Sequence, residues 1–322
     1  MPAPHPALYL LVAAILWGLC IPVMKALSAE QALLAPGIGS VPASLASLTV
    51  RFGLAAAALM AFFRIAPWRL NRSEWAHGGI LAAFTAVSMF LQVDGLSYTL
   101  ASTAGFLIAL YCVLVPLFAW LGRLRPMTPV LALSCALVVA GMALLTGIDP
   151  REMRLGRGEW ENLGAACLFA GQILWVDRVP AARTDPMKVT AALLLGVALA
   201  CGAALCMVPG GPGLPASLHS TPRAFWLEAI LALLGTAMPF ALMNRFQSRV
   251  GSVAAGFIYC CEPLATALGA FFLPELLVRD PALYPNERPT PGLLAGGALI
   301  LAANLWLLRD GNKTAAGSPE GP

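Results

Sequence analysis

The residues best suited to chemistry stand together in one apolar stretch, 252–275. Glu262 lies at its middle, Pro263 follows at once, and Tyr259 precedes by three residues, on the same face of a helix. A carboxylate among apolar residues is costly unless it faces a protein interior or a watery cavity, where it usually serves a function. Proline removes a backbone donor and bends or opens the helix, which exposes carbonyl groups beside the acid. The group therefore suits a substrate cavity in which Glu262 couples transport to protons.

A structural role for the same acid stays open. Glu262 would then hydrogen-bond backbone groups freed around Pro263, or cap a neighbouring helix, and would never meet a solute.

A second stretch resembles the first. Residues 103–111, TAGFLIALY, align with residues 254–262, AAGFIYCCE, at an offset of 151, so that Tyr111 stands in register with Glu262. We expect two copies of one unit that meet at these helices, with Tyr111 on the cavity wall. A chance match is the alternative, because Ala, Gly and Phe are common in this chain. Prolines 116, 239 and 263 are the expected helix kinks.

Composition identifies a polytopic membrane protein. Of its 322 residues 59% are hydrophobic and 11% are charged, against about a quarter charged in soluble domains. The net charge of +4 forms no basic stripe, which argues against a nucleic-acid partner. The eight cysteines lie inside apolar runs and the three histidines are far apart, so we expect neither a disulfide framework nor a metal site. No Gly-x4-Gly-Lys-Ser/Thr loop is present, so we expect no cofactor and no drive by ATP.

About 20 apolar residues are needed for a helix to cross the bilayer. On that rule the fold class is an all-α integral membrane protein with ten transmembrane helices, at residues 8–27, 44–63, 77–97, 101–121, 129–147, 163–180, 188–208, 224–243, 252–274 and 292–308. Residues 1–150 would form a first five-helix repeat and residues 151–309 a second, followed by a disordered cytoplasmic tail over 310–322. An odd number of crossings per unit turns the second copy upside down, and such inverted repeats are typical of secondary transporters.

Lysine and arginine in the loops set the orientation. With the N-terminus inside, the inner loops and tail hold 12 of them and the outer loops hold 6, while Lys25 and Arg51 lie inside helices. Both termini are therefore expected in the cytoplasm, with the chain in the cell inner (plasma) membrane.

Further polar and aromatic residues are candidates for the cavity. They are Gln92 on the third helix, Trp17 on the first, and Gln172 with Trp175 on one face of the sixth. Each has an alternative role in helix packing, since interhelical polar bonds are the commoner use of such residues. Gly292 and Gly296, spaced by four, suit close helix packing and are weak support for a homodimer.

Three charged residues fall toward the outer side. Lys25 is close enough to the interface to snorkel, and Arg51 lies about 10 Å into its helix. An ion pair of Arg51 with Asp94 would serve as an outer gate or as a static brace. On this reading no Lys or Arg stands at mid-membrane, which disfavours multiply charged phosphates as solutes.

Several motifs resemble the drug/metabolite transporter superfamily, EamA type. They are Trp17-Gly18 with Lys25, Arg51-Phe52, Gly95-Leu96 through Ala101-Ser102, Gly105–Tyr111 with Pro116, and Cys261-Glu262-Pro263 through Leu273-Pro274-Glu275. The resemblance covers about residues 8–308 and implies ten helices in inverted repeats, with both termini cytoplasmic. It also implies transport of small organic solutes, often export of amino acids or related metabolites.

The chain departs from that family pattern at two helix ends. Leu121-Gly122-Arg123 stands where the family usually has Leu-Gly-Glu, and Pro274 replaces a usual glycine. These differences put a symmetric role of the two helix ends in doubt, but not the fold.

The sequence therefore predicts a secondary transporter, an exporter of a small organic solute, rather than an enzyme. The alternatives are a polytopic lipid or isoprenoid transferase and a non-transporting membrane component. A transferase would need clustered acids, histidines or lysines near one membrane face, whereas Glu262 stands alone at mid-bilayer.

Overall fold

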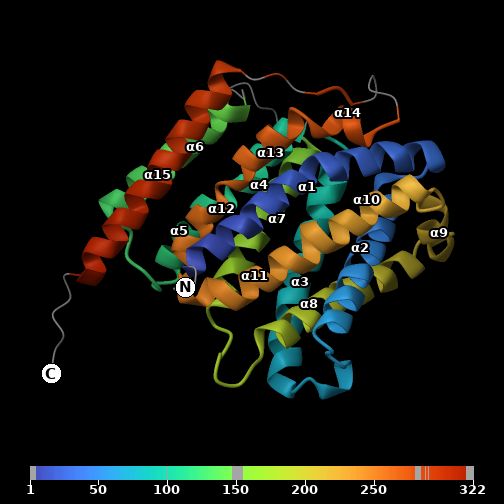
Figure 1. Cartoon of the computed structure of the whole chain (residues 1–322), viewed down its shortest axis with the longest axis horizontal. Coiled ribbons are helices and arrows are strands. Elements are labelled where there is room, and N and C mark those ends of the chain that lie inside the picture. The colour runs from blue at the N-terminus through green and yellow to red at the C-terminus, as the bar shows by residue number, and fades with distance from the viewer. Residues whose placement is uncertain are drawn as a thin grey trace.

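The computed structural model describes residues 5–99, 101–146, 155–279, 284–286, 288 and 290–316. Every regular element in these residues is a helix, and Figure 1 shows them as a bundle crossed diagonally by α1. The α-helices are α1 Pro6–Leu34, α2 Ser40–Phe62, α3 Arg72–Gly95, α4 Ala101–Ala109, α5 Tyr111–Leu121, α6 Pro129–Thr146, α7 Arg157–Val176, α8 Pro186–Cys206, α9 Leu214–Leu218, α10 Pro222–Ala232, α11 Met238–Phe246, α12 Ser252–Tyr259, α13 Glu262–Ala270, α14 Leu273–Leu277 and α15 Pro291–Ala316. Short 3-10 turns lie at Pro67–Arg69, Gly211–Gly213 and Gln247–Arg249, and a π-helical turn, η3, lies at Leu233–Ala237.

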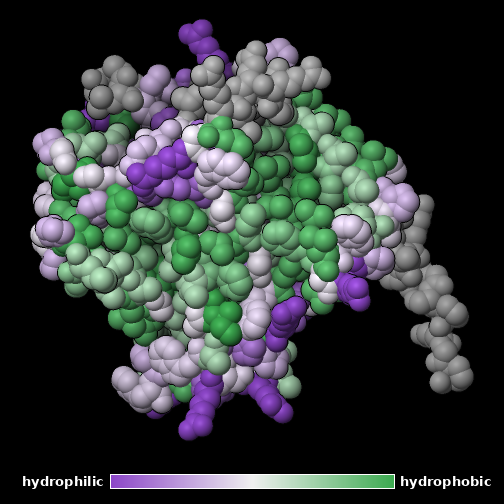
Figure 2. All heavy atoms as spheres, turned by 180° about the vertical axis from the view of Figure 1, so that it is seen from behind, coloured by the Kyte–Doolittle hydropathy of each residue, from purple (hydrophilic) through white to green (hydrophobic). Residues whose placement is uncertain are grey.

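Among the described residues, seven helical stretches are long and apolar enough to cross a membrane, and two shorter apolar helices occur at Pro129–Leu144 and Leu294–Ala303. Figure 2 shows a broad apolar belt on one face, with hydrophilic side chains gathered at its two ends. This distribution matches a protein whose flanks meet hydrocarbon and whose ends meet water.

Capping residues fix where several helices begin. The Asn71 side chain accepts a hydrogen bond from the backbone N–H of Glu74, and the Glu74 carboxylate accepts one from the backbone N–H of Asn71, both at 2.8 Å. α3 therefore starts at a capping box. Asp185 and Thr221 accept from backbone N–H groups of the first turns of α8 and α10, which each begin with a proline. These signals place the helix starts earlier than the apolar residues alone had suggested.

Three boundaries differ most from expectation. The first helix runs to Leu34 rather than to residue 27, and α7 starts at Arg157 rather than at residue 163. Each added segment carries a charged residue in an ion pair, Glu30 with Arg279 and Arg157 with Asp94. α15 continues to Ala316, so residues 310–316 of the predicted disordered tail are helical, while residues 317–322 lie outside the described residues.

The α6–α15 pair lies at one edge of the bundle (Figure 1). A methyl group added at Gly141 would meet the Gly296 carbonyl oxygen at 2.8 Å, and one added at Gly292 would meet the Leu144 carbonyl oxygen at 2.6 Å. Gly292 and Gly296, which the sequence offers as weak support for a homodimer, therefore pack α15 against α6 within the chain.

Candidate functional site

The two helices that carry the aligned stretches are interrupted at equivalent positions. Leu110 separates α4 from α5, and Cys260 and Cys261 separate α12 from α13. Leu110 and Cys261 stand directly before the second helix of each pair and are 151 residues apart. Leu110 N–H donates to the Leu107 carbonyl at 3.3 Å, and Cys261 N–H donates to the Ile258 carbonyl at 3.1 Å. The same offset therefore relates the residues, the breaks and the backbone hydrogen bonds at the breaks.

Tyr111 and Glu262 are the first residues after the two breaks, and they contact each other. The Tyr111 hydroxyl donates to Glu262 Oε2 at 2.9 Å and lies 3.3 Å from the Tyr259 carbonyl oxygen. That carbonyl has lost its backbone donor, because the residue four positions on is Pro263. The predicted opening of the helix at Pro263 is thus present, and a tyrosine from the other stretch fills it.

The first helix shows the same device at a proline that sequence inspection had passed over. Pro22 lies inside α1 and leaves the Gly18 carbonyl without a backbone donor. Thr266 Oγ1, on α13, donates to that carbonyl at 3.1 Å. A methyl group on Gly18 would lie 2.4 Å from the Glu262 carbonyl oxygen, so only glycine lets α1 approach α13 this closely.

The third case is the π-helical turn η3. Pro239, at the start of α11, leaves the Gly235 carbonyl free, and the Arg51 guanidinium approaches it at 3.5 Å while Arg51 Nε donates to Thr236 Oγ1 at 2.7 Å. The expected disturbance at Pro239 is therefore a π turn, a feature often found at functional sites.

Pro116, the third expected kink, lies inside α5, which continues through it. The break in this pair of helices stands earlier, at Leu110. The carbonyl that Pro116 leaves without a donor belongs to Cys112, which follows the break.

A central cavity of about 70 Å³ lies among these breaks. Six of the expected cavity residues line it, namely Trp17, Gln92, Tyr111, Gln172, Tyr259 and Glu262. The rings of Trp17 and Tyr259 meet edge to face at 5.4 Å, and the Gln172 amide oxygen accepts from Thr85 Oγ1 at 3.1 Å. Gln92 differs from Gln172, because its amide has no hydrogen-bond partner among the described residues and remains open to a solute.

Trp175 does not line this cavity. Its ring lies 6.1 Å from that of His77, and the Arg178 guanidinium lies over it at 5.6 Å. Trp175 lies about one helical turn after Gln172, and there its ring contacts His77 on α3 and Arg178 rather than the cavity.

The expected ion pair between Arg51 and Asp94 is wrong. Asp94, fully buried, pairs with Arg157 NH2 at 2.5 Å, and Arg157 also binds Glu161 at 2.7 Å. Because α7 begins six residues earlier than predicted, Arg157 sits on its first turn, next to the end of α3. Lys25 lies over the Tyr284 ring at 4.7 Å.

Arg51 instead lines the central cavity, which sequence reasoning had missed. α2 starts at Ser40 rather than at residue 44, so Arg51 stands at its midpoint, about 16 Å from either end. A cation therefore stands at the midpoint of a helix long enough to cross a membrane, contrary to the expectation. Gly39 at the N-cap and Ser40 and Pro42 in the first turn are residue types common in loops, and they hide the helix start.

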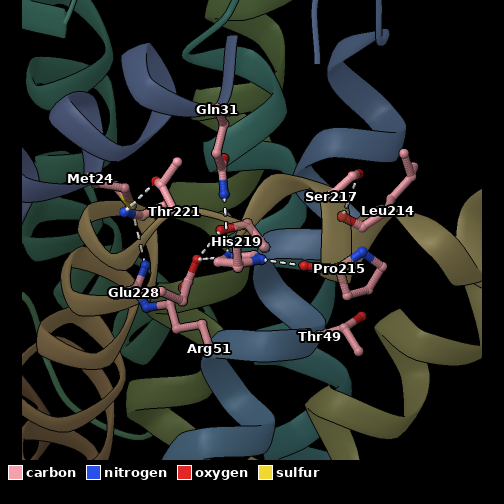
Figure 3. Close-up of polar contacts among 12 residues, drawn as sticks. Met24, Gln31, Thr49, Arg51, Leu214, Pro215, Ser217, His219, Thr221 and Glu228 are labelled. Atoms are coloured by element: carbon pink, nitrogen blue, oxygen red, sulfur yellow. Dashed lines mark hydrogen bonds and ion pairs between the residues drawn. The ribbon is translucent and has the colours of Figure 1, made fainter. Parts of the chain in front are cut away.

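A second cavity of about 260 Å³ lies beside the C-terminal half of α1 and the N-terminal half of α2 and shares Met24 and Arg51 with the first. Gln31 and Ser47 on its wall contact a polar cluster around His219 and Glu228, drawn in Figure 3. Glu228 Oε2 accepts from Ser47 Oγ at 2.9 Å and from His219 Nε2 at 2.8 Å, while His219 Nδ1 faces the Pro215 carbonyl at 2.8 Å. We call this cavity the vestibule.

His219 Nδ1 faces the Pro215 carbonyl and Nε2 faces Glu228 Oε2, while the Gln31 amide nitrogen lies 3.4 Å from Nε2. The two oxygen acceptors favour the protonated ring. Burial opposes this charge, but the hydrogen bond and charge of Glu228 outweigh it and raise the pKa of His219 above its ordinary value. The pair ties the loop before α10 to α10, and Ser47 adds α2 to the same cluster.

Comparison with known proteins gives three findings. Residues 6–147 match the model of the EamA-like transporter family. The chain is similar to the "Uncharacterized transporter YvbV" of Bacillus subtilis (strain 168), at 23% identity over 94% of this chain and 91% of that protein. A protein of known crystal structure has a TM-score of 0.61 and 16% identity, covering 94% of this chain and 98% of its own, which supports the fold alone.

Proposed function

We propose that this chain, whose residues 6–147 match the EamA-like transporter family, is a secondary transporter that exports a small organic solute, an amino acid or related metabolite, by alternating access. The solute would bind in the central cavity, between the two interrupted helices. One observation carries the proposal: Tyr111 and Glu262, matched by the offset of 151, meet by a 2.9 Å hydrogen bond on the cavity wall.

We propose further that ten helices cross the membrane as two inverted repeats, residues 1–150 and residues 151–309. The interrupted pairs α4/α5 and α12/α13 would each count as one crossing, as would α10 with α11. The equal spacing of the two breaks supports this division, since interrupted helices at corresponding positions of two halves mark the binding site of many transporters.

Orientation in the inner (plasma) membrane follows from the loop charges. The excess of Lys and Arg on one side supports cytoplasmic termini. The vestibule would then face outward, because it lies at the C-terminal end of α1.

Glu262 is proposed as the coupling or orienting acid. Its carboxylate has a single side-chain donor, Tyr111, and otherwise faces the cavity that the solute would enter. A buried carboxyl with one partner exchanges a proton more readily than one held in an ion pair.

Counterflow in proteoliposomes tests the proposal. Proteoliposomes that contain wild type or Glu262→Gln would be tested for counterflow of a labelled panel of amino acids and organic metabolites. Each test would be run with and without a pH gradient. We expect wild type to exchange at least one solute and to respond to the gradient, and the variant to exchange without that response.

Two results would contradict parts of this proposal. A variant that folds and keeps the full response to pH would make Glu262 structural. A wild type that exchanges nothing from the panel, although it reconstitutes as a folded protein, would remove transport of such solutes as its function.

A further inference from the structure

We propose that Arg51 binds a carboxylate of the transported solute, so that the central cavity takes a small solute with a carboxylate at Arg51 and an amine at Glu262. This assignment rests on the proposed transport function and adds the chemical class of the solute. It also gives Arg51 a role that neither the predicted gate nor the predicted brace describes.

The hydrogen-bond partners of Arg51 among the described residues are all uncharged. The side chain is 5% exposed. Of its five N–H donors, Nε is satisfied by Thr236 Oγ1 at 2.7 Å. Nη1 contacts the Met24 sulfur at 3.2 Å, and sulfur is a weak acceptor. Nη2 lies 3.5 Å from the Gly235 carbonyl, which is long for a hydrogen bond.

Among the described residues no carboxylate pairs with Arg51 within 4.0 Å. An unpaired cation in the middle of a membrane helix is strongly unfavourable, and such residues usually face a cavity and serve a binding or transport role. Guanidinium is the side chain best shaped for a carboxylate, because its planar fork donates two parallel hydrogen bonds.

The position of Arg51 suits this role. Among the described residues, Arg51 and Met24 line both the central cavity and the vestibule. A solute that passes between the vestibule and the centre must therefore pass the guanidinium.

The central cavity also holds an acid, Glu262, along the same stretch of α1. Gly18 packs against the Glu262 backbone, while Cys20 and Met24 lie beside the Arg51 guanidinium. These levels are two to six residues apart, about 3–9 Å along the helix axis. A compact solute with a carboxylate and an amine can therefore reach both groups.

The competing interpretation is a charge brace to Glu228. Figure 3 shows Arg51 below Glu228, whose Oε2 is taken by Ser47 and His219. Glu228 Oε1 is buried and has no hydrogen-bond partner, so a small shift would let Arg51 donate to it. A brace predicts that stability depends on Arg51 and that solute choice does not.

The two interpretations separate in a selectivity experiment. Proteoliposomes with wild type, Arg51→Gln, Arg51→Lys and Glu228→Gln would be tested for counterflow of three matched mixtures: α-amino acids, their primary amides and their decarboxylated amines. The amides and amines keep the nitrogen and lose the carboxylate. Monodisperse elution in detergent would show that each variant is folded.

We expect wild type to exchange the amino acids at least tenfold faster than either other mixture. Arg51→Gln should remove this preference, Arg51→Lys should keep part of it, because the charge remains but the fork is lost, and Glu228→Gln should keep it. The ratio between mixtures is the readout, since a purely structural role would lower all three rates together.

Three outcomes would overturn the inference. They are a wild type that exchanges amides or amines as fast as amino acids, an Arg51→Gln variant with an unchanged preference, and a wild type that exchanges none of the three mixtures. In the first two cases transport itself stands. In the third, the broader metabolite panel still decides the proposed function.

Discussion

The hydroxyl of Tyr111 donates a hydrogen bond to Glu262, and each of these residues is the first residue after the break in its own helix. They lie 151 residues apart in the chain and 2.9 Å apart in space. In the proposed inverted repeat, equivalent positions meet face to face only near the axis that relates the two copies, so this contact would mark that axis. The cavity surrounds it, where a solute would contact both halves at once.

Tyr111→Phe removes the hydroxyl that serves Glu262 and the Tyr259 carbonyl. We expect the free energy of unfolding to fall by about 1–2 kcal/mol, or about 2–4 °C in Tm, and counterflow to lose part of its response to pH. Differential scanning fluorimetry in detergent and the proteoliposome assay measure the two effects. An unchanged Tm together with an unchanged response would mean that the hydrogen bond contributes nothing.

Thr266 and Pro22 should be energetically coupled. Thr266→Val leaves the Gly18 carbonyl without a donor, which costs about 1–3 kcal/mol. Pro22→Ala restores a backbone N–H at the position that serves Gly18, so Thr266→Val should cost less in the Pro22→Ala background. A double-mutant cycle on Tm measures the difference, and additive effects would show that the threonine does not replace the missing backbone bond.

Gly18→Ala should destabilise the protein, because the new methyl group would lie 2.4 Å from a backbone oxygen of Glu262. Overpacking of this kind costs about 1–3 kcal/mol. The matched control is Gly79→Ala on α3, where the methyl group meets open space and helix propensity predicts a gain of about 0.5–1 kcal/mol. The two changes should thus shift Tm in opposite directions, and a loss at Gly79 or a gain at Gly18 would contradict the packing.

The His219–Glu228 pair predicts a stability that depends on pH. The pKa of His219 is raised in the folded state, so the stabilisation is fully present below the unfolded value of about 6.5 and is lost as pH rises through the higher folded value. The Tm difference between wild type and His219→Gln should therefore be larger at pH 6 than at pH 9. His77→Gln is the control, because His77 has no carboxylate partner in the described part of the chain and its difference should not vary in this way.

Much of the bundle follows from local signals. Long apolar runs gave the spans, and the repeat of Ala-Gly-Phe placed Tyr111 against Glu262 before any contact was known. That inference succeeded because a register, once set by one matched triplet, fixes every later residue of a helix. Pro263 and Pro239 were also predictable, since the lost backbone donor is a property of the residue itself.

Partners of charged residues were not predictable in the same way. Asp94 was assigned to Arg51, but it binds Arg157, because a polar helix start hidden in a charged loop brings that arginine closer. The sequence placed Arg51 too near the surface because the first turn of α2 carries Ser40 and Pro42, residue types common in loops. Distances between helices, rather than patterns along one helix, decide such pairs.

Three of the carbonyls that prolines leave free are contacted from the other half of the chain. Thr266 donates to Gly18, the Tyr111 hydroxyl lies 3.3 Å from Tyr259, and Arg51 approaches Gly235. Separating the halves on either side would strip these carbonyls of their donors, and in hydrocarbon that loss is prohibitive. Water must enter as the halves part, so wetting of the three proline bends and opening of the path would be one and the same event.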